Sequence, residues 1–94
     1  MPTATFAEFE STARAQGFDE VLVREWQPGQ LINTHVHPFA VKAQVVAGEF
    51  KLTEGERSRS LQAGDSFELA RDTPHAEHYG PDGATFWVAR RHSG

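Results

Sequence analysis

Residues 29–48 read GQLINTHVHPFAVKAQVVAG, and this stretch decides how the rest of the chain is interpreted. It carries His35 and His37, which are separated only by Val36. Residues two apart in a β-strand point to the same face, so the two rings would lie on one side, about 6.6 Å apart along the chain. Two imidazoles placed in this way can converge on one ion. A further histidine, His75, lies much later in the chain and could close such a site from a different strand.

Strand-like segments surround this stretch and alternate with turn residues at regular intervals, which is typical of an all-β sandwich or barrel. Clusters such as Pro28-Gly29, Gly64-Asp65 and Pro81-Asp82-Gly83 mark the expected reversals, because glycine adopts positive φ and proline presets φ. No helical pattern intervenes to connect parallel strands, so the sheet should be antiparallel. The sequence predicts a jelly roll or small barrel of eight strands, at residues 20–26, 31–37, 40–47, 49–54, 57–62, 66–70, 74–79 and 84–91.

The segment before the first predicted strand is expected to form a short N-terminal α-helix. Thr5 and Glu8 have the spacing of a capping box, and Gly17 stands where the helix would end. Apolar side chains recur at helical spacing, at Phe6, Phe9 and Ala13. We therefore expect residues 1–94 to form a single domain, in which a helix within residues 1–18 packs on a barrel formed by residues 19–91.

The composition limits the chemistry that the chain can support. It has no cysteine, so any metal ion must be held by nitrogen or oxygen ligands. A net charge of -4 argues against nucleic acid as a partner, and the basic run Arg90-Arg91-His92 is interpreted as a solvated end. No apolar stretch approaches the roughly 20 residues needed to span a bilayer, and the first residues do not resemble a signal peptide. We therefore expect a cytoplasmic protein without a membrane partner.

A second stretch makes the interpretation specific. Residues 64–75 read GDSFELARDTPH, which is a turn, a short strand and then His75. The pattern Gly29-x5-His35-x-His37-x10-Gly48 resembles the first motif of the cupins, and Gly64-x10-His75 resembles the second, in the same order. The resemblance to small single-domain cupins implies a β-barrel that holds a divalent transition metal on His35, His37 and His75. The metal would be Fe, Zn, Ni, Mn or Cu.

The chain also departs from the cupin pattern. Cupins usually place a glutamate ligand four residues after the second histidine, where this chain has Val41. Strand parity makes Glu77 the best replacement, because it faces the same side as His75. His78 faces the other side, and Gln44 is out of phase with position 41. The second motif also lacks its usual asparagine, at Tyr79, and its usual Pro-x-Gly, at Ala70-Arg71-Asp72.

Aromatic residues near the two motifs are expected to shape the pocket or the core, namely Phe39, Phe50, Phe67, and Phe86 or Trp87. The strand Thr85-Phe86-Trp87-Val88-Ala89 is apolar on both faces, so both should be buried. One face would line the barrel, and the other would pack against the helix or a second subunit. We expect a homodimer, as the resemblance to small jelly rolls of this family implies.

Three functions are compatible with these features. The first is a metal-dependent enzyme, dioxygenase-like in its three-histidine site, that acts on a small organic molecule. The second is a sensor that binds a small molecule in the same pocket without converting it. The third is a metal-free site of the sugar isomerase type, in which His75 or Tyr79 carries a proton. The paired imidazoles argue against the third, because buried ring nitrogens would be left without partners.

Overall fold

The computed structural model describes residues 5–92. One helix is followed by strands that pair in antiparallel fashion throughout. This confirms the predicted fold class. The elements are α1 (Phe6–Ala15), β1 (Glu20–Trp26), β2 (Leu31–His35), β3 (Ala40–Glu54), β4 (Arg57–Gln62), β5 (Ser66–Leu69) and β6 (His75–Arg91).

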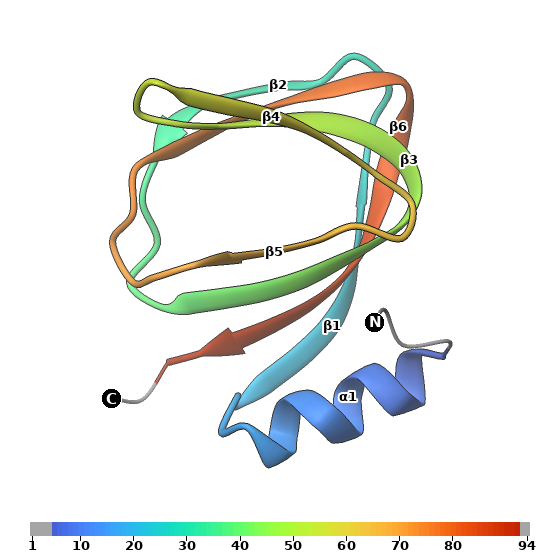
Figure 1. Ribbon diagram of the computed structural model, residues 1–94, viewed down its shortest axis with the longest axis vertical. Coiled ribbons are helices and arrows are strands. Elements are labelled where there is room, and N and C mark those ends of the chain that lie inside the picture. The colour runs from blue at the N-terminus through green and yellow to red at the C-terminus, as the bar shows by residue number, and fades with distance from the viewer. Residues whose placement is uncertain (1–4, 93–94) are drawn as a thin grey trace.

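Two long strands, β3 and β6, hold the fold together because each takes part in two layers. The second half of β6 pairs with β1 and with the first half of β3, which also pairs with β5. The first half of β6 pairs with β2 and with the second half of β3, which also pairs with β4. Figure 1 shows the result, with β2 and β4 in the upper layer and β5 and the start of β3 in the lower one.

The described residues form six strands rather than the predicted eight. Residues 40–47 and 49–54 belong to the single strand β3, and residues 74–79 and 84–91 belong to β6. Register shifts between Val45 and Phe50 mark the bend of β3 without ending its pairing with β6. The prediction of a chain reversal at Pro81-Asp82-Gly83 is also wrong, because this segment bends within β6. A glycine or proline cluster thus marks a bend as readily as a chain reversal.

The two bends contact each other, and this contact requires glycine. Gly48 of β3 has φ 76° and pairs with Ala84 of β6. A Cβ atom on Gly48 would overlap the carbonyl oxygen of Gly83. Gly83 also has positive φ, and a Cβ atom there would overlap the carbonyl oxygen of Trp26. The backbones of β3, β6 and the end of β1 can therefore approach closely only without side chains at these positions.

The interior of the barrel is rich in aromatic rings. Phe50 contacts Phe67, Tyr79 and Phe86, with ring centroids 4.8 to 5.5 Å apart. All four are buried, and they come from β3, β5 and β6, so they tie the two layers together. Aliphatic side chains complete this core, namely Val41, Val45, Leu52, Leu61, Leu69 and Val88.

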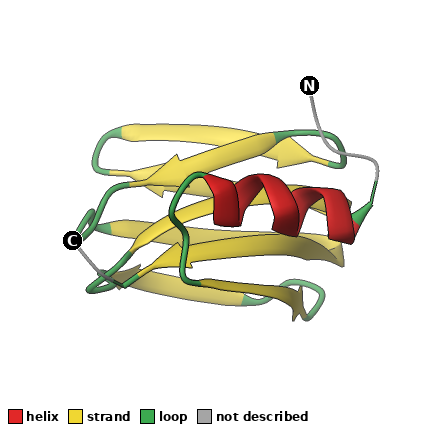
Figure 2. Cartoon of the chain, turned by 90° about the horizontal axis from the view of Figure 1, so that it is seen from below, coloured by secondary structure: helices red, strands yellow, loops and turns green. Residues whose placement is uncertain are grey.

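Helix α1 lies along the outside of the strands (Figure 2), where it contacts β1 and β6. Its N-cap is Thr5, whose side chain accepts a hydrogen bond from the amide of Glu8, as the capping box predicts. Trp87 contacts Phe6 and Phe9 of the helix, whereas Phe86 faces the barrel core. One face of the last strand therefore packs on the helix. Residues 1–4 of the predicted helical segment lie outside the described residues. No helix within residues 5–92 is long and apolar enough to cross a membrane.

Candidate metal centre

The three predicted histidines meet at one end of the barrel. His35 is the last residue of β2 and pairs with His75, the first residue of β6. His37 follows two residues later, and one nitrogen from each ring lies within 4.8 Å of the others. His75 is the most enclosed, with 4% of its surface exposed. Antiparallel pairing of β2 with β6 therefore brings together residues that are far apart in the sequence.

His37 reaches the cluster from a loop rather than from a strand. Strand β2 ends at His35, two residues before the predicted end, after an irregularity between Ile32 and His35. The loop is fixed to the turn before β6, because the amide of Asp72 donates a 2.9 Å hydrogen bond to the carbonyl of His37. Val36 points to solvent, with 51% of its surface exposed. The predicted alternation therefore holds although the strand is shorter.

Backbone contacts orient two of the three rings. Nδ1 of His35 lies 2.8 Å from the carbonyl oxygen of Asn33, and Nδ1 of His75 lies 2.8 Å from that of Thr73. A carbonyl oxygen only accepts hydrogen bonds, so Nδ1 must carry the hydrogen in both rings. In the neutral ring Nε2 then carries no hydrogen, so it can accept a hydrogen bond, as Nε2 of His35 can from Nε2 of His37, or bind a metal ion. A hydrogen bond from the other ring nitrogen to a carbonyl is the usual arrangement of a metal-ligating histidine.

The spacing of the nitrogens fits one ion. Nε2 of His35 lies 3.1 Å from Nε2 of His37. Two nitrogens bound about 2.1 Å from an ion, at the angles of tetrahedral or octahedral coordination, lie about 3.0 to 3.4 Å apart. The pair therefore already has the separation of two ligands. The third ring is close by, because its nitrogen lies within 4.8 Å of those of the other two and its centroid lies 4.3 Å from that of His35.

Glu77 is beside the cluster, where strand parity placed it. Its Oε2 lies 3.7 Å from Nε2 of His35 and 3.9 Å from Nε2 of His75. Its Oε1 accepts a 2.5 Å hydrogen bond from the hydroxyl of Tyr79, which fixes the carboxylate. A negatively charged carboxylate this close to two ring nitrogens favours a metal cation at the cluster.

The three histidines and Glu77 line one pocket, which the other sequence candidates share only in part. Val41 lines it as an apolar side chain. His78 is exposed on the outer face of β6, and the buried Gln44 is not among the lining residues. Among the predicted aromatic residues, Phe39, Phe67 and Phe86 line the pocket, whereas Phe50 lies in the core.

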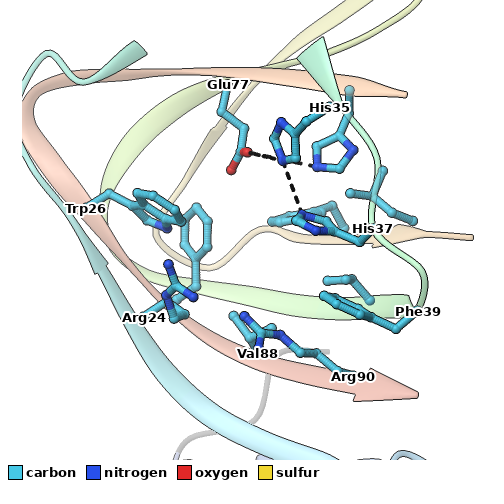
Figure 3. A pocket seen from close by; sticks show the side chains of 13 residues that line it. Arg24, Trp26, His35, His37, Phe39, Glu77, Val88 and Arg90 are labelled. Atoms are coloured by element: carbon cyan, nitrogen blue, oxygen red, sulfur yellow. Dashed lines mark hydrogen bonds and ion pairs between the residues drawn. The ribbon is translucent and has the colours of Figure 1, made fainter. Parts of the chain in front are cut away.

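The pocket has a second polar side that the sequence did not indicate. Figure 3 shows Arg24 and Arg90 across the pocket from His35, His37 and Glu77. Arg90 was expected to be part of a solvated end, and this interpretation is wrong. Because β6 continues to Arg91, the side chain of Arg90 points into the barrel, where it lies over the ring of Phe39. Alternation along the last strand could have indicated this, since Phe86, Val88 and Arg90 share a face.

Burial lowers the pKa of His37 from 6.5 to about 4, and the positive charges that can form on His35 and His75 and those of Arg90 and Arg24 add to the effect. His37 therefore stays neutral well into the acidic range, which suits a metal ligand.

Lowering the pH from about 7 to about 4 is expected to destabilise the metal-free protein. In the unfolded chain His37 takes up a proton near its ordinary pKa of 6.5, whereas in the folded protein it does so only near about 4. Between these values the unfolded state binds more protons, so stability is lost as the pH falls. The ring is partly exposed, so the loss of stability should not exceed about 2 kcal/mol.

Urea unfolding of the metal-free protein at several pH values measures this loss, and His37→Asn should remove most of this pH dependence. An identical pH profile in the variant would contradict the assignment to His37.

A model of the cupin domain matches residues 22–89, which include both histidine segments and every strand except the ends of β1 and β6. The chain is a cupin. The family match extends the resemblance of the two motifs to most of the chain.

Solved structures of several other proteins are similar to this one. An uncharacterised conserved protein with a double-stranded β-helix domain from Klebsiella pneumoniae is 28% identical, with a TM-score of 0.65, over 76% of this chain and 64% of that one. The DMSP lyase DddQ from Ruegeria pomeroyi is 26% identical, with a TM-score of 0.69, over 76% of this chain and 36% of that one. An RmlC-like cupin from Shewanella frigidimarina is 25% identical, with a TM-score of 0.66, over 79% of this chain and 68% of that one.

This cupin therefore spans less than two thirds of the first protein and about a third of the lyase. The comparison with curated protein sequences found no match.

Proposed function

We propose that this cupin binds one divalent transition metal ion on Nε2 of His35, His37 and His75, and that the ion and the adjoining pocket bind a small organic molecule. The observation that carries the proposal is the convergence of the three rings, two of which are held by backbone carbonyls in the tautomer that leaves Nε2 free. The ion would be Fe, Zn, Ni, Mn or Cu, since imidazole ligands suit several of these metals.

The chain's own residues have distinct roles in this proposal. Asn33 and Thr73 orient the rings of His35 and His75 through their carbonyl groups. Tyr79 holds the carboxylate of Glu77 beside these two rings. When bound, a divalent ion supplies a Lewis acid and, if it is iron or copper, a redox centre. Apolar side chains on the pocket wall exclude water from around the ligand, namely Phe39, Val41, Phe67, Leu69, Phe86 and Val88.

The metal-free isomerase is the weaker alternative. Tyr79, one of its candidate proton carriers, has 1% of its surface exposed and does not line the pocket. Burial raises the pKa of its hydroxyl, and the hydrogen bond to Glu77 raises it further. A tyrosine that holds its proton so firmly, away from the pocket, is poorly suited to exchange a proton with a ligand.

Elemental analysis of the purified protein, followed by calorimetric titration with single metal ions, tests the proposal. We expect one ion per chain. Turnover then separates an enzyme from a sensor. Oxygen consumption with small thiols, diketones and acids measures dioxygenase activity, and incubation with DMSP measures the activity named for the lyase. Binding of a small molecule without turnover would favour the sensor, and failure to bind any transition metal would overturn the proposal.

Glu77→Gln is expected to weaken metal binding by about tenfold, because it removes a negative charge beside two of the three rings. The amide oxygen can still accept the hydrogen bond from Tyr79, so the fold should be retained. Calorimetry with zinc measures the change. Glu68→Gln, at an exposed position on β5, is the matched control and should bind as the wild type does. Equal affinity in all three proteins would mean that Glu77 does not assist the site.

We also propose that the protein is a homodimer and that it is located in the cytoplasm, as the sequence predicts. Strand β1 ends the order of the main sheet, and its Val23 leaves 48% of its surface exposed, which supports a surface available for a second subunit. Light scattering during gel filtration would contradict the dimer if it found only a species of 10.4 kDa.

A further inference from the structure

Two guanidinium groups lie against aromatic rings at the wall opposite the histidines. The Cζ atom of Arg24 is 4.7 Å from the centroid of the Trp26 ring, and that of Arg90 is 5.0 Å from the centroid of Phe39. All four residues line the pocket that contains the histidine cluster (Figure 3). Stacking on an aromatic ring fixes the plane of a guanidinium while its edge stays free to donate hydrogen bonds.

The hydrogen-bonding capacity of this wall is not used up. Arg24 makes no ion pair with any of residues 5–92. Arg90 directs Nη1 to Glu20, 3.4 Å away, but its Nε is buried and has no hydrogen-bond partner. The indole nitrogen of Trp26 is also buried without a partner. The guanidinium of Arg24 therefore remains available to an acceptor in the pocket, and that of Arg90 has further donors beside Nη1.

We infer that Arg24 and Arg90 form a binding subsite for the carboxylate of a small organic acid, whose remaining atoms extend toward His35, His37 and His75. Guanidinium groups match carboxylates in shape and charge and bind them with charge-assisted hydrogen bonds. The inference names the ligand class for the proposed metal site and in that respect rests on the proposed function. The carboxylate contact itself depends only on the two arginines.

The size and charge of the pocket narrow the ligand further. The cavity measures about 100 Å³, far below the several hundred that sites for larger ligands enclose. The side chains of Val88, Phe86 and Leu69 offer an apolar wall for a short alkyl chain. Glu77 lines the same pocket, and Glu20 already faces Arg90, so the positive charge available is closer to that needed by a monoanion than by a doubly charged phosphate. A short-chain monocarboxylate fits these limits.

Propionate is the probe, and propionamide is its neutral counterpart of similar shape. In the metal-free protein at pH 7, NMR signals of the arginine Nε–H groups report directly on the subsite. We expect propionate to shift the signals of Arg24 and Arg90 with saturation in the millimolar range, and propionamide to shift them at least tenfold less at equal concentration. Equal effects of the two molecules, or no shift of either arginine signal, would overturn the inference. Tighter binding of inorganic phosphate than of propionate would overturn the assignment to a carboxylate.

Variants test the arginines separately. Arg24→Gln and Arg90→Gln should each weaken propionate binding at least tenfold, and Arg90→Lys should recover part of the loss because it keeps the charge. Arg57→Gln, at an exposed position that begins β4, is the matched control and should bind propionate as the wild type does. Circular dichroism verifies that each variant is folded. Wild-type affinity in both glutamine variants would contradict the inference, and the wild-type titrations decide it even if one variant fails to fold.

The proposed metal site and the inferred carboxylate subsite can be contradicted independently of each other. The arginine variants should bind zinc with unchanged stoichiometry, since neither residue contacts a histidine nitrogen. If the wild type binds no metal but propionate shifts the two arginine signals, the proposed function is wrong and the subsite stands. If zinc binds but propionate affinity does not depend on Arg24 or Arg90, the inference is wrong and the metal site stands.

Discussion

Replacing His75 by alanine is expected to abolish stoichiometric metal binding, with a loss of affinity of at least about a hundredfold. The residue supplies one of three converging nitrogens, and it is the most enclosed of them. Two remaining imidazoles would have to hold the ion with water in the third place, and the ring of His37 would lose its contact with the ring of His75, whose centroid is 5.2 Å away. Calorimetric titration with zinc and elemental analysis after dialysis measure the effect.

His78→Ala is the matched control for this experiment. His78 belongs to the same strand three residues later, but it is exposed on the outer face. It should bind zinc with wild-type affinity. Because His75 is buried, its variant must first be shown to fold by circular dichroism, and His35→Ala provides a second test at a more exposed ligand. Unchanged zinc affinity in both ligand variants would contradict the three-histidine site, and so would an equal loss in His78→Ala.

The largest expected effect on stability comes from Gly48→Ala, which should lower the free energy of unfolding by about 3 kcal/mol or more. Two costs add at this position. An L-residue is strained at φ 76°, and its Cβ atom would overlap the backbone of Gly83. A domain of this size has a total stability of about 5–15 kcal/mol, so the loss would be a large share of it. Urea unfolding followed by circular dichroism measures the change.

Gly29→Ala separates these two costs. Gly29 also has positive φ, at 67°, but a Cβ atom added there would have no other residue's atoms within 4 Å, apart from its chain neighbours. It should therefore lose only the conformational part, about 1–2 kcal/mol. If the two variants lost the same free energy, the close approach of β3 and β6 would not be what requires glycine at position 48.

The sequence predicted the grouping of the three histidines better than it predicted the strands. The spacing of His35 and His37 predicted their common face, and the Gly64-x10-His75 spacing placed His75 in the second motif. The same period-two alternation located Glu77 beside His75. These inferences succeeded because side-chain direction in a strand depends on parity alone, and it survives when the strand ends two residues early at His35.

The continuity of β3 and β6 through their bends could not be predicted in this way. Gly48 and Gly83 are typical turn residues in isolation, and only their contact across the barrel shows that β3 and β6 bend without ending. Arg24 was missed because it is an ordinary strand residue in its own segment, and Arg90 was missed because it was interpreted as part of a solvated end. They acquire a common role only when β1 pairs with β6 and brings both to one wall of the pocket.

A crystal structure of the zinc-loaded protein, with anomalous diffraction recorded at the zinc absorption edge, tests the central claim most directly. We expect a single zinc peak in each chain, about 2.0–2.1 Å from Nε2 of His35, His37 and His75. No peak at this place after loading, or a zinc ion held there by other side chains without these three nitrogens, would contradict the claim that the histidine cluster is a metal site.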